Sequence, residues 1–136
     1  MGFNEQLEEY QKAIAKLVPT PSQKAEITKQ GANILEKSYY DATKSKHYDE
    51  HREVGKVKHL ADAVMSQNSD IDGDRTGTST VGYMVDPINH ARIARFLNDG
   101  TRYIKGDHFI DKAIEESKED ILQAQFKEYK KITGGN

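Results

Sequence analysis

The chain has 136 residues, 20 Lys and Arg against 22 Asp and Glu, and no cysteine. This length predicts one domain that buries about two thirds of the surface of its unfolded chain. The lack of cysteine excludes disulfide frameworks, thiolate metal sites and cysteine nucleophiles, and a net charge of −2 gives no general attraction to nucleic acid. No apolar run approaches the roughly 18 residues of a membrane span, and the acidic, amphipathic first residues do not resemble a secretory signal. We therefore expect a soluble module made inside the cell, with no membrane partner and no specific nucleic-acid partner.

The hydrophobic core is expected to be thin. Hydrophobic residues make up 35% of the chain, and adding the 10 glycines still leaves the apolar share below the roughly 45–50% of an average globular domain. A thin core suggests that part of the stability comes from binding a partner.

Two helices are predicted at the N-terminus, in residues 1–46. The first carries an apolar stripe at spacings of four and three, formed by Phe3, Leu7, Tyr10, Ile14 and Leu17. Pro19 and Pro21 end it, because proline cannot donate a hydrogen bond into a continuing helix. The second begins with a capping box of Thr20 and Gln23 around Pro21. Its stripe is weak and rich in small residues, which suits close packing, and we expect the two helices to form a helical hairpin.

A β-hairpin is expected in the middle of the chain. Residues 45–58 are very polar and indicate a fraying helix end and a mobile loop, and residues 60–64 form a helical turn. Residues 64–71 and 78–85 then form paired strands, because Val81, Tyr83 and Val85 alternate along the second of them. The connection between them, residues 72–77, is dense in turn formers.

Two further helices complete the expected fold. Asp86 and Pro87 are typical of a helix start, and Gly100 is a natural helix stop. After a loop, Asp107 caps a long last helix that ends near Ile132, and residues 133–136 form a flexible tail. The pattern predicts a single α+β domain over residues 1–136: two N-terminal helices, a central antiparallel hairpin or small sheet, a middle helix and a long C-terminal helix.

Two patterns resemble metal sites. His47-Tyr-Asp-Glu50-His51 matches the His-x-x-Glu-His spacing of inverted zinc peptidases, but nothing downstream supplies a matching third ligand, and a charged helix end gives the same pattern. Residues 68–79 resemble a calcium loop, but Ser79 occupies the place of the bidentate Glu. A turn rich in Asx side chains explains these residues equally. We therefore expect no metal and no cofactor.

Other candidates for chemistry are weaker. The glycines at 100 and 106 precede the last helix, whose free N–H groups favour anions, but a cap by Asp107 explains the same residues. His90 is expected on the surface of the third helix rather than as a catalytic base, and no Ser or Thr has the setting of a hydrolase nucleophile. Tyrosines mixed with lysines near residues 39–58 favour a protein interface over nucleic acid, because nearby acidic residues dilute the basic patch. We predict that the chain is not an enzyme.

From Gly55 onward the sequence carries an ordered series of short motifs. These are Gly55 with Leu60-Ala-Asp-Ala-Val64, then Val81-Gly82-Tyr83, then Ala91-Arg-Ile-Ala-Arg-Phe96-Leu-Asn-Asp-Gly100-Thr101, and finally Gly106-Asp-His108-Phe109-Ile110-Asp-Lys-Ala113. The series resembles the tail-completion, or head–tail joining, proteins of long-tailed phages (the Hong Kong phage gene-product-ten-like family). It covers residues 55–132. The chain departs from that family at Asn98-Asp99, where an acidic and an aromatic residue are common.

The resemblance implies a structural protein of the phage neck, present in the host cytoplasm during assembly and in the virion neck afterwards. Its partners would be copies of itself in a ring, for example a hexamer, head-completion or connector proteins, and tail tube or terminator proteins. We expect the interface to include Phe96, Leu97, Arg102, Tyr103 and Phe109. For Phe96, Leu97 and Phe109, simple core packing is an equal alternative. The alternative function is a small metal-binding or adaptor protein of a bacterial or prophage operon.

Overall fold

The computed structural model describes residues 2–48, 59–86 and 88–134. Along the chain it contains α1 (Phe3–Ala15), α2 (Pro21–His47), a short 3₁₀ turn (Ala61–Ala63), β1 (Val64–Gln67), β2 (Thr80–Tyr83), α3 (His90–Asp99) and α4 (Phe109–Thr133). This is the α+β layout predicted from the sequence, with four helices and a two-stranded antiparallel sheet in the described residues.

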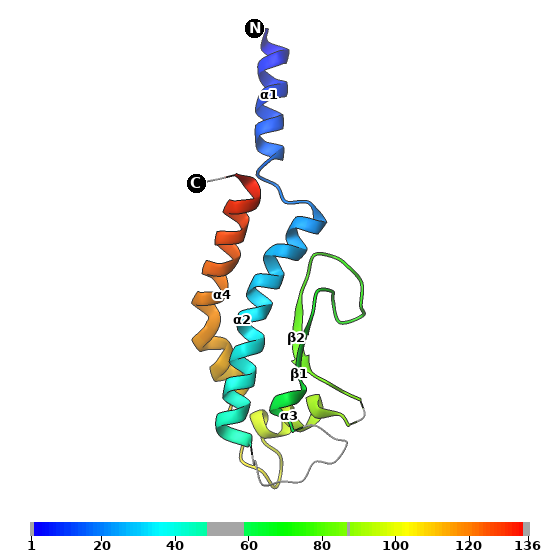
Figure 1. Ribbon diagram of the computed structural model, residues 1–136, viewed down its shortest axis with the longest axis vertical. Helices are drawn as coiled ribbons and strands as arrows, with labels where there is room; N and C mark the ends of the chain where they lie inside the picture. Colours follow the sequence, from blue (N-terminus) through cyan, green and yellow to red (C-terminus); the bar gives the residue numbers. More distant parts are fainter. Residues whose placement is uncertain (1, 49–58, 87, 135–136) are drawn as a thin grey trace.

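Helices α2 and α4 run side by side and form the long axis of the body (Figure 1). They approach closely at Gly31 of α2, where an added Cβ would lie 2.9 Å from Cγ2 of Ile121 and 2.6 Å from Nε2 of Gln125. Gly31 and the next residue, Ala32, are both buried. The small residues of α2 therefore serve close helix packing, as predicted.

The hairpin of β1 and β2 packs beside α2, with Val64 opposite Tyr83 and Gln67 opposite Thr80 (Figure 1). The predicted strands, residues 64–71 and 78–85, were too long: β1 ends at Gln67, and β2 covers only Thr80–Tyr83. Side chains just beyond the paired residues bond to α2 instead: Asn68 Nδ2 donates to the Ala25 carbonyl (2.9 Å), and the Ser79 and Thr28 hydroxyls are 2.8 Å apart.

The buried core is small, as the composition predicts. It joins Tyr39, Tyr83, Ala94, Phe109 and Ala113, with the rings of the two tyrosines stacked 5.9 Å apart. The Tyr83 hydroxyl lies 2.7 Å from Oγ1 of the fully buried Thr43, which in turn donates to the Tyr39 carbonyl (2.6 Å). Burial, more than any other cause, raises the pKa of Tyr83 to about 12 and also raises the pKa of Tyr39.

Helix α1 does not form a hairpin with α2, contrary to the prediction for residues 1–46. It projects beyond the end of the α2–α4 pair (Figure 1), and none of its residues, all of which the structure describes, is buried. Its joint to the body is fixed by the Tyr129 hydroxyl of α4, which donates to the Leu17 carbonyl (2.6 Å). The partner of α2 is therefore α4, which lies far from it in sequence.

Helix α3 begins later than predicted. Asn89, not Asp86, is its N-cap and accepts a hydrogen bond from the Arg92 N–H (3.0 Å), while Pro87 lies outside the described residues. The His90 N–H donates to the Met84 carbonyl (2.9 Å), which ties the first turn of α3 to the end of β2. This contact explains why His90 is 4% exposed, and the prediction that it lies on the surface was wrong.

The helix ends follow the sequence signals in most places. The Thr20–Gln23 capping box starts α2, and α2 runs through His47 into the segment predicted to fray. The remainder of the predicted loop, residues 49–58, lies outside the described residues. Gly100 ends α3 with φ 92°, a conformation open mainly to glycine. Thr133, predicted in the flexible tail, is the last residue of α4, and residues 135–136 are not described.

Candidate assembly interface

The amphipathic stripe of α1 forms as predicted, but nothing in the described chain covers it. Its large apolar side chains keep much of their surface in solvent, from 44% for Leu7 to 77% for Phe3. We call this surface the α1 stripe: Phe3, Leu7, Tyr10, Ile14 and Leu17. Contiguous exposed apolar residues on a folded protein mark an interaction surface or a liability to aggregate.

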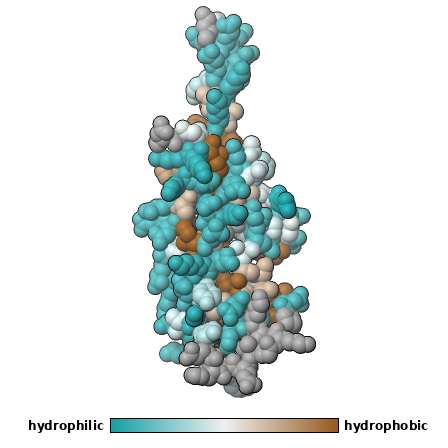
Figure 2. Space-filling model, viewed as in Figure 1, coloured by the Kyte–Doolittle hydropathy of each residue, from teal (hydrophilic) through white to brown (hydrophobic). Residues whose placement is uncertain are grey.

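Figure 2 shows one face of the molecule, on which most of α1 and the body is hydrophilic. Hydrophobic colour appears on it in separate spots and where α1 joins the body. On this face the body therefore presents a mostly polar surface.

A second candidate surface lies at the opposite end of the molecule. A groove of about 800 Å³ follows α3 and includes Val85, the second residue after β2, and we call it the α3 groove. Its apolar lining includes Val85, Ala91 and Phe96, and its basic lining consists of Arg92 and Arg95. The Arg92 guanidinium lies over the Phe96 ring, 5.3 Å from its centroid, and Val85 is 56% exposed.

The predicted interface residues fall into two groups. Phe96 (38% exposed), Arg102 and Tyr103 (89% exposed) present side chains to solvent, with Arg102 over the Tyr103 ring. Leu97 packs against the core, and Phe109 is 3% exposed within it. The structure thus places Phe109 in core packing, the alternative that its helical spacing left open.

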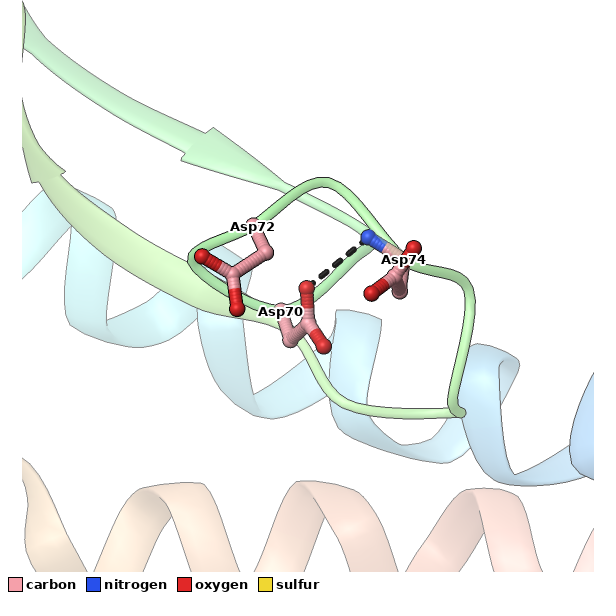
Figure 3. Close-up of side chains that lie close together, drawn as sticks. All are labelled: Asp70, Asp72 and Asp74. Atoms are coloured by element: carbon pink, nitrogen blue, oxygen red, sulfur yellow. Dashed lines mark hydrogen bonds between the residues drawn. The ribbon is translucent and has the colours of Figure 1, made fainter.

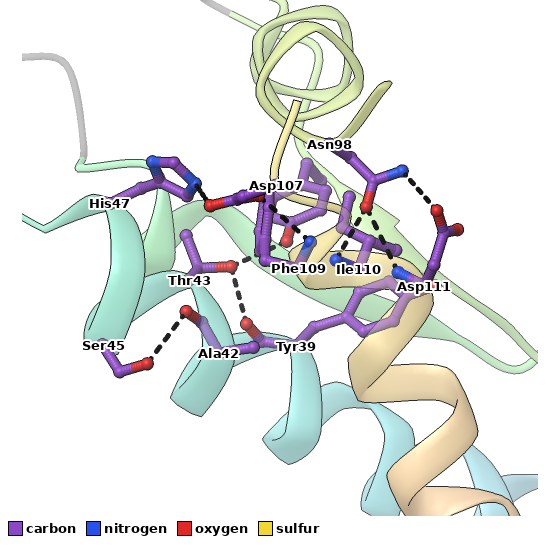
Figure 4. A network of polar contacts seen from close by, with 11 residues as sticks. Tyr39, Ala42, Thr43, Ser45, His47, Asn98, Asp107, Phe109, Ile110 and Asp111 are labelled. Carbon is purple, nitrogen blue, oxygen red and sulfur yellow. Dashed lines mark hydrogen bonds and ion pairs between the residues drawn. The ribbon is translucent and has the colours of Figure 1, made fainter. Parts of the chain in front are cut away.

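The N-terminus of α4 is held by side chains of this chain (Figure 4). The predicted cap at Asp107 was one residue off: the N-cap is His108, in the left-handed conformation and without a capping bond from its side chain. Asp107 Oδ1 still accepts from the Phe109 N–H of the first helical residue (3.1 Å). Asn98 Oδ1 accepts from the N–H groups of Ile110 (2.9 Å) and Asp111 (3.2 Å). The groups that an anion would need are therefore already engaged.

Asn98 has the structural role that sequence reasoning missed. It is 5% exposed, and its amide nitrogen donates to carboxylate oxygens of Asp99 (2.8 Å) and Asp111 (3.0 Å). The backbone carbonyl oxygen of Asn98 also accepts from the His108 N–H (3.0 Å). Asn98 thereby joins the end of α3 to the start of α4, at a position where the sequence departs from the resembled family. Its partners in α4 lie 12 and 13 residues later along the chain, so no local motif signalled this role.

The proposed zinc pattern is not assembled in the described residues. His47 Nε2 lies 2.8 Å from Asp107 Oδ2, and the His47 ring meets the Phe109 ring edge-on at 4.6 Å (Figure 4). Glu50 and His51 lie outside the described residues. His47 therefore contributes to holding the end of α2 against the start of α4.

The calcium-like loop brings three carboxylates together. Oxygens of Asp70, Asp72 and Asp74 lie within 4.8 Å of one another (Figure 3). The loop is closed by its own hydrogen bonds, because the Asp74 N–H donates to Asp70 Oδ1 (2.8 Å). Ser79 accepts from Asn68 Nδ2 (2.7 Å) and faces α2 rather than joining the carboxylates. These residues form the Asx-rich turn that the sequence offered as the alternative.

No protein-family model, no curated protein and no solved structure matches the chain. Among the described helices, none is long and apolar enough to cross a membrane.

Proposed function

We propose that this chain is a structural protein of the phage neck, which completes the tail or joins it to the head as a homo-oligomeric ring. The observation that carries its assembly role is the α1 stripe, which projects from the body with large apolar side chains in solvent. An apolar helix face of this kind favours binding to another protein chain. The motif series from Gly55 to Ala113 supports the phage role, by resemblance.

In this proposal the chain performs no catalysis and needs no cofactor. Its partners are copies of itself, head-completion or connector proteins on one side, and tail tube or terminator proteins on the other. It acts in the host cytoplasm during assembly and stays in the neck of the mature virion. Phe96, Arg102 and Tyr103 remain proposed contact residues, because their side chains reach solvent near the start of the α4 segment.

Deletion of the gene from its phage tests this function. We expect filled heads and separate tails to accumulate, and a copy supplied in trans to restore infectious particles. Arg102→Glu should weaken this rescue while the purified chain keeps its unfolding midpoint, and the matched reversal Lys118→Glu, on the exposed face of α4, should rescue normally. Normal virions from the deletion phage, or absence of the chain from particles and their precursors, would refute the neck role.

A metal-binding role is the second candidate, and the Asp70–Asp72–Asp74 cluster is the observation in its favour. Oxygen-only ligands of this kind suit calcium. Titration of the purified chain with calcium and with zinc, followed by amide chemical shifts, tests it. We expect no saturable binding at micromolar metal, and saturation of the Asp70–Asp74 amides in that range would favour the metal-binding role over the neck role.

A further inference from the structure

We infer that two copies of this chain pair through their α1 stripes, with the two α1 helices side by side and antiparallel. The inference deepens the self-association part of the proposed function and rests on that part, because it names a surface at which copies meet. Helix α1 is the one α-helix of the described chain with no buried residue. A helix of 13 residues is marginal in water when nothing packs against it, so the stripe is expected to have a partner.

The α1 stripe has the repeat of a coiled-coil seam. Its residues alternate at spacings of four and three, which are the spacings of the a and d positions of a heptad. Leu7 and Ile14 stand at a, and Phe3, Tyr10 and Leu17 stand at d. A stripe of a and d positions is narrower than the face with which a helix covers a globular core. Its width therefore suits the seam of a second helix.

The charge pattern leaves this seam free to meet an identical seam. The residues that border it are uncharged: Asn4 and Gln11 stand at e, and Gln6 and Ala13 stand at g. The charged residues of α1 stand at b, c and f, on the side of the helix away from the seam. They are Glu5, Glu8, Glu9 and Lys12. A coiled-coil helix that selects a different partner by charge carries that charge at e and g, whereas two copies of α1 can meet without like charges at the contact.

The shape of the molecule selects the antiparallel direction. Helix α1 projects from one end of a body in which α2, α4 and the hairpin of β1 and β2 lie side by side (Figure 1). The axes of paired helices lie about 8–10 Å apart, so a parallel pair would place both bodies at the same end, in a space narrower than either body. An antiparallel pair places the two bodies at opposite ends and lets the α1 stripes meet along their length.

The side chains of the stripe also fit one another best in this direction. An antiparallel register that brings a opposite d places Phe3 opposite Ile14, and Leu7 opposite Tyr10, and the twofold axis repeats both layers. Every layer then combines one aromatic ring with one branched aliphatic side chain, so the layers have similar volumes. A parallel pair would instead place Phe3 against Phe3 and Tyr10 against Tyr10, next to layers that are only aliphatic.

The area of this contact predicts a weak pair. Burial of a large apolar side chain removes on the order of 100 Å² from water, so two stripes with their bordering residues bury about 1,000 Å² in total. This area lies at the lower end for specific complexes, at roughly 1,000–1,200 Å². The pair should therefore dissociate on dilution and form where copies are concentrated, as they are within an assembly.

Pairing of this kind uses the same surface of both copies, which makes the interface isologous. It joins copies in twos and cannot by itself close a larger ring. The proposed ring therefore needs a second, different contact, for which Phe96, Arg102 and Tyr103 remain the proposed residues.

The absence of cysteine from the chain allows a direct test with the full-length protein. Asn4→Cys and Gln11→Cys, which leave the stripe intact, are prepared separately, mixed and joined with a short bis-maleimide, and the linked peptides are identified by mass spectrometry. In the antiparallel register, position 4 of one copy lies beside position 11 of the other. We expect these positions to link faster than either links to itself, because like positions lie about 10 Å apart along the helix axis.

Three further variants are controls for direction and for surface. Gln6→Cys borders position 11 of a second copy only in a parallel pair, so equal or faster linkage of positions 6 and 11 would overturn the antiparallel inference. Phe96→Cys and Leu122→Cys represent the α3 groove and the exposed apolar surface of α4. Equal or faster linkage of position 11 to either of them would overturn the inference in favour of that surface.

A charge pairing at g gives an independent measurement by sedimentation. Gln6→Glu with Ala13→Glu in one chain should raise the dissociation constant of self-association by about tenfold, because position 6 faces position 13 of the second copy and like charges then meet. Gln6→Lys with Ala13→Lys should do the same. A mixture of these two variants should associate at least as tightly as the original chain, since each glutamate then faces a lysine. The control Glu5→Lys with Glu9→Lys, on the side of α1 away from the seam, should leave the dissociation constant unchanged.

A mixture that associates no more tightly than the separate variants would overturn the antiparallel pairing, and so would a chain that sediments as a monomer at high concentration and forms no link through α1. These outcomes are separable from failure of the neck role. Chains that pair through α1 but are dispensable for virions would refute the phage function and leave the pairing standing, whereas an essential neck protein without this pairing would do the reverse.

Discussion

Helices α1 and α2 show opposite relations between sequence pattern and burial. Helix α1 has the clearer apolar stripe, yet all of its residues are exposed. Helix α2 has a weak stripe of small residues, yet it buries Gly31, Ala32, Tyr39 and Thr43 against α4 and the hairpin. Helical periodicity thus identifies a face that needs a partner, but it does not say whether that partner is in the same chain.

The size of the side chains explains the difference. Small residues in α2 let two backbones approach closely inside one molecule, and Gly31 beside Ile121 marks that approach. Large side chains in α1 stay exposed in the described chain and suit contact with a separate molecule after folding is complete. The comparison predicts that substitutions in the body change stability, whereas substitutions in α1 change association.

The largest loss of stability is expected from Phe109→Ala. Phe109 is 3% exposed, and removing its ring should lower the free energy of unfolding by about 4 kcal/mol through lost burial and a residual cavity. Phe126→Ala provides the control in the same helix. Because Phe126 is 57% exposed, this substitution should lower the free energy of unfolding by less than about 1 kcal/mol. Denaturant unfolding measures both, and equal losses would contradict the assignment of Phe109 to the core.

Asn98→Ala should have the next largest effect. It leaves the N–H groups of Ile110 and Asp111 without their acceptor in a nearly buried setting, at a cost of about 2 kcal/mol. Asn89→Ala removes the exposed cap of α3 and should cost about 1 kcal/mol. If Asn98→Ala lowers the free energy of unfolding no more than Asn89→Ala does, the link between α3 and α4 adds little to stability.

The buried tyrosine pair predicts a loss of stability at high pH. Burial raises the pKa of Tyr83 from 10.0 to about 12, so between these values the unfolded chain ionises while the folded chain stays neutral. The unfolded state therefore binds fewer protons, and stability falls as pH rises from 10 to 12, by about 2 kcal/mol. Unfolding curves across this range should show the fall, Tyr83→Phe should reduce it, and Tyr103→Phe at an exposed site should not.

The smallest change in stability is expected for Leu7→Ser with Ile14→Ser. Because α1 buries no residue, the free energy of unfolding should change by less than about 0.5 kcal/mol, measured at concentrations where the chain is monomeric. Sedimentation at high concentration should nevertheless show weaker self-association. Unchanged association, or unfolding of the body, would contradict the contrast between α1 and α2.

Local signals in the sequence predicted most of the fold. The capping box at Thr20 and the glycine stop at Gly100 act over three or four residues, and both are present. The errors arose where distant contacts compete with local preference. The strands are shorter because Asn68 and Ser79 bond to α2, and His90 is buried because its backbone bonds to the end of β2.

The candidate interface was only partly predictable for the same reason. Helical spacing could not separate Phe96, which reaches solvent, from Phe109, which fills the core, because both fit an apolar face. The role of Asn98 depends on residues 12 and 13 positions later along the chain, a separation that no short motif encodes. The exposure of the α1 stripe became visible only when α4, rather than α1, proved to be the partner of α2.

The bond between the Tyr129 hydroxyl and the Leu17 carbonyl has a consequence for geometry. It holds the chain just before the two prolines of the joint and so favours one direction of α1 relative to the body. In the proposed ring this direction would repeat in every copy, because all copies are identical. Tyr129→Phe would therefore change the direction of α1 without altering the α1 stripe itself.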